Sequence, residues 1–389
     1  MNRREFLKVC GTVLMCQSSP FLLKSVLAKQ KAVQRLLVLV ELKGGNDGLN
    51  MLVPFTEPKY FQLRPKLAVK RDRVLQVSET LGFNPQLTPL MDIWKQKQLA
   101  IISGVGYPQP NRSHFRSIDI WDTGSSSKEY LREGWLARLL PHIPKSATAT
   151  ADGATVGSGA GPLAGGDFNV IVMRKVERFF RQAQKVQAIE VDTENPALSH
   201  ILSVQNHLNR TATLLKQRIA TAGRLSTPFP KTVIGRNLET AAKLIACHAD
   251  IPVIKVSQGG FDTHANQQSI HDRLLGQLAE ALAAFRNAML ETGMWLQVVV
   301  MTYSEFGRRP AENGSRGTDH GTAAPHLMLG GNIKGGLYGV QPSLVDLENG
   351  DLKFNVDFRS LYTTIARRWF GVSAEFLNGR IYALIDCIA

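Results

Sequence analysis

The chain has 389 residues, of which 44% are hydrophobic and 20% charged, an ordinary composition for a globular protein. Its formal net charge is +14, but the basic residues are spread along the sequence without interleaved stacking motifs, which argues against nucleic acid as a partner. No run of about 20 apolar residues follows the N-terminal segment, so we expect no membrane span in the mature chain.

The first 28 residues are typical of a twin-arginine signal peptide. Arg3 and Arg4 precede Phe6-Leu7-Lys8, a moderately apolar stretch follows, and small residues end the segment at Ala28. An ordinary amphipathic helix is the simpler alternative. We expect export of a folded protein by the twin-arginine machinery to the periplasm or the medium, and a single domain over residues 29–389.

Three strand-like runs each end in a turn that carries acidic or imidazole side chains. Residues 35–42 lead into a glycine-rich turn around Asp47, and residues 251–256 lead into Gly259-Gly260-Phe261-Asp262-Thr263-His264. Residues 296–302 lead into Ser304-Glu305. Ligands bind at the carboxyl ends of strands in open α/β sheets, so the three turns predict one shared crevice.

The other segments alternate between strand and helix patterns. Ile270, Leu274 and Leu278 begin an apolar stripe along a helix at 269–291, which makes a βαβ unit with the strands before and after it. Further strands are predicted at 99–105 and 326–331, further helices at 86–98, 195–224, 238–248 and 357–370, and a loop at 146–166. This order predicts an α/β fold, a three-layer α/β/α sandwich with a mainly parallel central sheet.

Two cysteines, Cys247 and Cys387, remain beyond the signal segment. They could form one disulfide in an oxidising compartment or lie buried as small hydrophobic residues, and we favour burial.

The acidic and imidazole residues favour a divalent metal site, because zinc, manganese and iron sites mix carboxylates with imidazoles. Each candidate also has a structural interpretation: Asp47 could cap a helix, Glu305 could pair with Arg308 or Arg309, and His326 could be a core histidine. The predicted ligands are Asp47, Asp262, His264, Glu305, Asp319, His320 and His326.

Five motifs carry a family resemblance. They are Gly-Gly-Asn-Asp-Gly-Leu-Asn at 44–50, Ser-His-Phe with Trp-Asp-Thr-Gly at 113–124, Gly-Gly-Phe-Asp-Thr-His at 259–264, Ser-Glu-Phe-Gly-Arg at 304–308 and Asp-His-Gly at 319–321. With the signal segment, they resemble the uncharacterised exported family DUF1501 across essentially the whole mature chain.

The DUF1501 pattern is in turn similar to the alkaline phosphatase superfamily of phosphatases, sulfatases and mutases, which implies an alkaline-phosphatase-like fold. The resemblance implies that Asp47, Asp262 and His264 bind metal and that a nucleophile begins the helix after the second strand. Ser113 and His114 align with that nucleophile equally well.

The last ligands have two possible alignments. Either Glu305 replaces the usual Asp and Asp319-His320 is the final pair, or Asp319-His320 is the displaced pair and His326 is the last ligand. Asn46 and Arg112 are the predicted substrate-binding residues, Arg112 through bidentate contacts with substrate oxygens.

These features predict an exported hydrolase of phosphate or sulfate esters with one or two divalent ions, zinc before manganese, magnesium or calcium. Its substrate would be an anionic small molecule or polymer. The alternative is a binding or assembly protein that keeps the fold without catalysis. Nucleotide-dependent redox chemistry ranks third, because no Gly-x-Gly-x-x-Gly or P-loop motif follows any strand.

Overall fold

The structure is a computed structural model that describes residues 35–144, 149–166, 168–173, 176–183, 195–377 and 379–389. The predicted signal segment, residues 1–28, lies outside the described residues. Arg35–Ala389 forms one compact unit. Within the described ranges, no helix is both long and apolar enough to cross a membrane.

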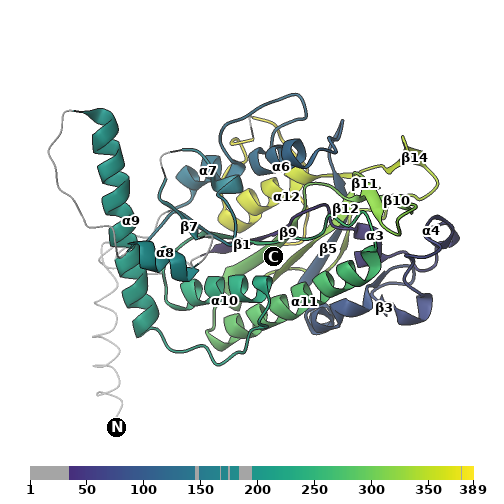
Figure 1. Cartoon of the computed structure of the whole chain (residues 1–389), viewed down its shortest axis with the longest axis horizontal. Coiled ribbons are helices and arrows are strands. Elements are labelled where there is room, and N and C mark those ends of the chain that lie inside the picture. Colours follow the sequence, from purple (N-terminus) through teal and green to yellow (C-terminus); the bar gives the residue numbers. More distant parts are fainter. Residues whose placement is uncertain (1–34, 145–148, 167, 174–175, 184–194, 378) are drawn as a thin grey trace, which may run out of the picture. The chain divides into compact units, whose positions relative to one another are not determined.

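A large, mainly parallel sheet runs through the centre of this unit (Figure 1). Its strand order is β13-β5-β12-β9-β1-β8-β6-β7, and β16 also pairs with β5. Among the described strands of this sheet, only β12 runs antiparallel to its neighbours, β5 and β9. The strands are β1 (Leu36–Leu42), β5 (Leu99–Gly106), β6 (Gly153–Val156), β7 (Val170–Met173), β8 (Val253–Gln258), β9 (Val298–Tyr303), β12 (Ala324–Gly330), β13 (Gly336–Tyr338) and β16 (Val356–Asp357).

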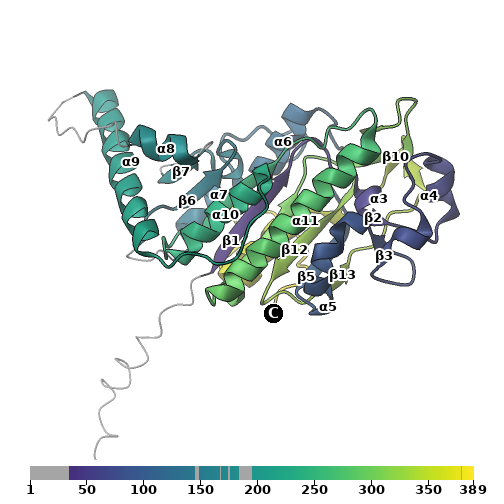
Figure 2. The same cartoon turned by 60° about the horizontal axis from the view of Figure 1, so that its bottom comes forward.

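Helices cover both faces of the sheet, which makes the predicted three layers (Figure 2). Successive side chains of β1 point to opposite faces: Val38 and Val40 join the core under α10 (Val233–Ala246) and α11 (Gln267–Glu291). Leu37 and Leu39 join the second core, under α6 (His114–Thr123), α7 (Trp135–Leu139) and α12 (Phe358–Thr364). A strand buried on both faces explains the continuous apolar run in the sequence. The α/β sandwich is therefore confirmed.

The predicted βαβ unit is β8, α11 and β9, with β1 lying between its two strands. Leu39 of β1 lies opposite Lys255 of β8 and Met301 of β9 in parallel register. All three strands therefore end at the same edge of the sheet. The turns after β1, β8 and β9 meet there, as the strand pattern predicted.

Several smaller elements complete the unit beyond this edge. They are α3 (Gly48–Met51), β2 (Leu52–Val53), α4 (Pro58–Leu63), β3 (Leu75–Gln76), β4 (Gly82–Phe83), the hairpin of β10 (Arg308–Glu312) and β11 (Thr318–His320), and the pair β14 (Leu347–Glu348) and β15 (Asp351–Leu352). Farther along the chain, α8 (Val176–Ala183) and α9 (Pro196–Thr221) contact each other, and α9 also contacts α10.

Two sequence predictions need correction. The segment 146–166 is not simply a loop, because β6 lies within it and pairs with β7 and β8 as a buried sheet strand. Four residues between glycine-rich flanks are too short to give a strand signal. The predicted helix at 86–98 is a 3₁₀ helix at Pro85–Leu90 followed by α5 (Met91–Lys95), because Pro89 interrupts regular α-helical hydrogen bonding.

Both cysteines are free and buried, as favoured from the sequence. Cys247 packs in the core on the α10 and α11 face, and Cys387 packs in the core on the opposite face.

Candidate metal centre

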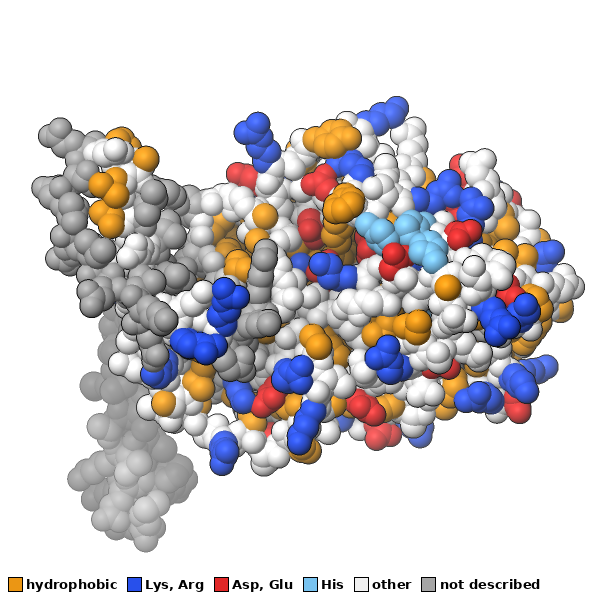
Figure 3. Space-filling view, viewed as in Figure 1, with side chains coloured by type: hydrophobic (Ala, Val, Ile, Leu, Met, Phe, Trp, Pro, Cys, Tyr) orange, Lys and Arg blue, Asp and Glu red, His pale blue; other side chains and the backbone are white. Residues whose placement is uncertain are grey.

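Three histidines surround one carboxylate at the carboxyl edge of the sheet. Asp262 lies in the loop between β8 and α11, and its Oδ1 is 3.0 Å from Nε2 of His264 and 3.2 Å from Nε2 of His320. Its Oδ2 is 3.3 Å from Nε2 of His114, the first residue of α6. The histidine side chains form a group on the molecular surface in Figure 3.

The outer nitrogen of each imidazole faces an acceptor. Nδ1 of His114 lies 2.9 Å from Oε1 of Glu305, and Nδ1 of His320 lies 2.8 Å from the carbonyl oxygen of Arg112. Nδ1 of His264 lies 3.5 Å from Oδ1 of Asp319. In the tautomer with the proton on Nδ1, each imidazole donates to its outer acceptor and has an Nε2 lone pair available for a metal ion, whereas a proton on Nε2 of His320 donates to Asp262 instead.

This arrangement fits a divalent metal ion. One ring nitrogen of His114, one ring nitrogen of His320 and an oxygen of Asp262 all lie within 4.8 Å of one another. Ligand histidines usually donate their other N–H to a carboxylate or a backbone carbonyl, and that is the environment of His114 and His320. Imidazole-rich donor sets suit zinc or iron, whereas magnesium and calcium prefer oxygen ligands.

Asp262 is held ionised by its neighbours. Partial burial alone would raise its pKa, but hydrogen bonds from Arg308 and His320 and the charge of Arg308 lower the pKa to about 2. The Arg308 guanidinium is fully buried and donates to Oδ1 of Asp262 at 2.7 Å and to backbone carbonyls that include Gly45 and Thr318. Arg308 therefore joins the turns after β1 and β8 to the β10–β11 hairpin.

Gly44 lets two of the turns approach closely. Its φ is +115°, and an added Cβ would lie 2.3 Å from the backbone nitrogen of Asp262, so a side chain has no room there. Its own N–H donates to Oε1 of Glu305 at 2.8 Å. This glycine, in the turn after β1, thus helps to fix the carboxylate that orients His114.

Asp47 lies in a separate buried network. Its Oδ2 forms a 2.6 Å ion pair with Arg64 and accepts a hydrogen bond from Gln267, while its Oδ1 accepts from the backbone of Leu49 and caps α3. Burial acts to raise the pKa of Asp47, but Arg64 and His271 outweigh it and the pKa is lowered. The helix cap that the sequence allowed is therefore present, together with a charge partner 17 residues away.

The remaining candidates also lie outside the histidine group. Asn46 is buried, its Oδ1 faces Nε2 of His271 at 3.0 Å and its amide contacts the sulfur of Met51. His326 is 2% exposed in β12, packs edge-on against Trp121 with 5.2 Å between ring centroids, and has no hydrogen-bond partner among the described residues. Burial lowers the pKa of His326 to about 3.

Ser113 and His114 differ in what they contact. His114 points to Glu305 and Asp262, whereas Ser113 is the exposed N-cap residue of α6 and its hydroxyl makes no capping hydrogen bond. Arg112 contributes its carbonyl to His320, and its guanidinium binds Asp351 at 3.0 Å.

Sequence reasoning missed Arg64 and the role of Arg308. No sequence motif around Arg64 marks it as the partner of Asp47, because the two residues meet only in the folded chain. The sequence allows Arg308 or Arg309 as a partner of Glu305, but the carboxylate that Arg308 binds is that of Asp262. Its place in Ser-Glu-Phe-Gly-Arg, directly after a strand end, was a usable signal.

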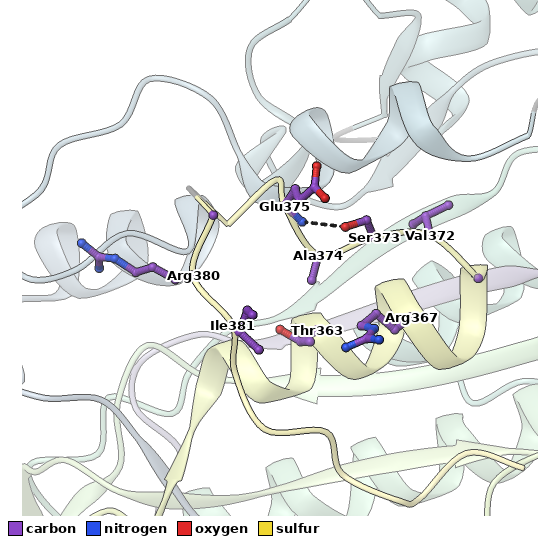
Figure 4. Close-up of a pocket in the computed structure, with 10 residues that line it drawn as sticks. Thr363, Arg367, Val372, Ser373, Ala374, Glu375, Arg380 and Ile381 are labelled. Atoms are coloured by element: carbon purple, nitrogen blue, oxygen red, sulfur yellow. Dashed lines mark hydrogen bonds between the residues drawn. The ribbon is translucent and has the colours of Figure 1, made fainter.

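A surface pocket of about 680 Å³ lies elsewhere and is lined by residues between Thr363 and Ile381 (Figure 4). Thr363 of α12 and Arg367 face it from one side, and the segment from Val372 to Glu375 borders it. None of the candidate site residues lines this pocket.

The family profile described as "Protein of unknown function (DUF1501)" matches residues 82–378. The chain belongs to the DUF1501 family. A search of curated proteins found no match to the sequence.

Solved structures similar to this DUF1501 chain include a sulfatase, a periplasmic domain and a member of the alkaline phosphatase superfamily. The PsFucS1 sulfatase from Pseudoalteromonas sp. is 10% identical, with a TM-score of 0.42 and coverage of 93% of this chain and 72% of the sulfatase. The C-terminal periplasmic domain of EcEptC from Escherichia coli, solved in complex with Zn, is 8% identical, with a TM-score of 0.38 and coverage of 76% and 73%. A protein in the alkaline phosphatase superfamily from Vibrio parahaemolyticus is 8% identical, with a TM-score of 0.33 and coverage of 80% and 64%.

Proposed function

We propose that the chain is an exported, metal-dependent hydrolase of phosphate or sulfate esters. The observation that carries the proposal is the convergence of three imidazole Nε2 atoms on Asp262, with an acceptor facing each Nδ1. Two of these histidines, His114 and His320, and the carboxylate would hold one zinc ion.

The ion pair between Asp47 and Arg64 favours one bound ion over two. The buried Arg64 guanidinium lies 2.6 Å from Asp47 and supplies the positive charge that a second cation would otherwise bring. We therefore assign the ion to His114, Asp262 and His320, with His264 beside them, its Nε2 2.9 Å from Nε2 of His320. Glu305 and Asp319 act through His114 and His264, as acceptors that orient the rings.

The bound ion would act as a Lewis acid on an ester oxygen. Because His114 is engaged by Glu305, we assign the nucleophile to Ser113, whose hydroxyl is exposed beside it. In this mechanism the Ser113 oxygen bonds to phosphorus or sulfur, the alcohol departs with the bonding electron pair and takes up a proton, and water then hydrolyses the serine ester. Arg112, whose carbonyl oxygen faces His320, would contribute to binding of the anionic substrate.

Two single variants separate metal binding from catalysis. Purified wild type should contain about one zinc per chain by elemental analysis and should cleave an aryl phosphate or an aryl sulfate. Asp262→Ala should lose both properties, whereas Ser113→Ala should keep zinc and lose turnover. Retention of full turnover by both variants would refute the proposal, and metal-free protein that binds anionic polymer without hydrolysis would support a binding protein instead.

The proposed compartment is the periplasm or the medium, reached by the twin-arginine route. The support is the pair Arg3-Arg4 ahead of an apolar stretch and the small residues near Ala28. Fractionation of cells that produce the full chain, with antibody detection, tests this location directly.

A further inference from the structure

Two arginines share one buried carboxylate beside the histidine group. Oδ2 of Asp351 is 3.0 Å from Nη1 of Arg112, and Oδ1 is 3.4 Å from Nε of Arg309. The Asp351 side chain is 4% exposed, whereas the side chains of Arg112 and Arg309 are 40% and 38% exposed. The carboxylate is thus enclosed, and both guanidinium groups are open to solvent.

Both arginines are fixed next to His320. The carbonyl oxygen of Arg112 lies 2.8 Å from Nδ1 of His320. Arg309 follows Arg308, which pairs with His320 across the β10–β11 hairpin and binds Asp262. Figure 3 shows basic side chains gathered beside the histidines on this face.

The charge of this group is unbalanced. One carboxylate neutralises only one of the two guanidinium groups, so the group of three carries a net charge of about +1 at neutral pH. Each guanidinium has five N–H donors in a fixed plane, so donors remain for a second anion after Asp351 is bound. The shared carboxylate also holds the two cations together against their mutual repulsion.

We propose that Arg112, Arg309 and Asp351 form an anion subsite, and that the substrate carries a second anionic group that binds there. This inference rests on the proposed function for the site of hydrolysis. The substrate class is a polyanion with sulfate or phosphate groups on successive repeats, one at the metal centre and the next at the two arginines. A substrate with a single anionic group would leave the subsite without a partner.

The test measures polymer binding and selectivity in Arg309→Gln, with Arg273→Gln as the matched control. Arg273 is exposed on α11, so its replacement removes the same charge away from the subsite. The probes are fluorescently labelled oligomers of dextran sulfate and of poly(glycerol phosphate), followed by anisotropy at fixed ionic strength. Inorganic sulfate and phosphate, used as competitors, report binding of a single anion.

Loss of one charge-assisted contact should weaken oligomer binding by about tenfold in Arg309→Gln, and Arg273→Gln should match wild type. The ratio of kcat/KM for the oligomer to kcat/KM for an aryl ester should fall by a similar factor. Preference for one of the two oligomers identifies sulfate or phosphate as the anion. Equal oligomer affinities in Arg309→Gln and Arg273→Gln would overturn the subsite.

The binding measurement needs no turnover, so it remains informative if the chain hydrolyses no ester. In that case the proposed function fails while the subsite is still tested. Conversely, ester hydrolysis that depends on Asp262, together with unchanged oligomer binding in Arg309→Gln, would leave the function standing and remove the subsite.

Discussion

Replacement of Glu305 by Gln isolates the effect of one negative charge on the metal centre. Oε1 of Glu305 faces Nδ1 of His114 at 2.9 Å and accepts the Gly44 N–H at 2.8 Å, and Oε2 lies 3.3 Å from the Ser304 hydroxyl. A glutamine can keep its oxygen at the first position and place its NH₂ against Ser304. The variant therefore preserves shape and removes charge.

The expected loss follows from the role of Glu305 as a positioning residue. A carboxylate behind a ligand histidine raises the basicity of the coordinating nitrogen, and its removal typically lowers metal affinity by about 10- to 100-fold. That range corresponds to about 1.4–2.8 kcal/mol of binding free energy. Because the Glu305 side chain is only 6% exposed, solvent does little to screen its interaction with His114.

Zinc affinity of Glu305→Gln should be measured by competition with a chromophoric chelator. Glu291→Gln is the control, since Glu291 also accepts backbone hydrogen bonds but ends α11, about 36 Å along the helix from Gln267. Circular dichroism of the metal-free variant checks that the fold is retained. A zinc Kd within twofold of wild type in a folded variant would refute the assignment of His114 as a ligand.

Three further changes test other parts of the molecule. Asp47→Asn should lower the free energy of unfolding by about 3–5 kcal/mol in urea denaturation, because it leaves the buried Arg64 charge unpaired. The same variant should keep the zinc stoichiometry of wild type. Loss of zinc at full stability would instead make Asp47 a ligand. Wild-type stability should fall as the pH drops from about 6.5 towards 3, by up to about 1.4 kcal/mol per pH unit, because the unfolded chain takes up a proton at His326 that the folded chain refuses. His326→Leu should flatten that slope and keep zinc, and an unchanged slope would show that other groups cause it. Replacement of Arg3 and Arg4 by Lys should retain the precursor in the cytoplasm, as seen by immunoblot, while export at the wild-type level would exclude the twin-arginine route.

The sequence could predict the strand ends because their signal is local. Asp262, His264 and His320 follow or adjoin glycine-bounded turns, and a parallel sheet brings such turns to one edge. The same reasoning could not place Asp47, because its partner Arg64 reaches it only through tertiary packing.

The sequence also could not decide which of two adjacent residues at the start of a helix faces the site. Consecutive helical residues point about 100° apart, so the residue at which α6 begins decides whether Ser113 or His114 faces Asp262. An alignment of motifs does not determine the residue at which the helix begins. The strand β6 escaped detection for a different reason, since its burial comes from its neighbours β7 and β8 and not from a long apolar run of its own.

The separation of Cys247 and Cys387 on opposite sides of the sheet has a consequence for biogenesis. Their thiols cannot meet without dismantling the fold, so Arg35–Ala389 reaches its native state without an oxidant or a thiol isomerase. Melting temperatures in the presence and absence of a reductant should coincide. A chain that needs no disulfide can fold completely in the reducing cytoplasm before it is exported.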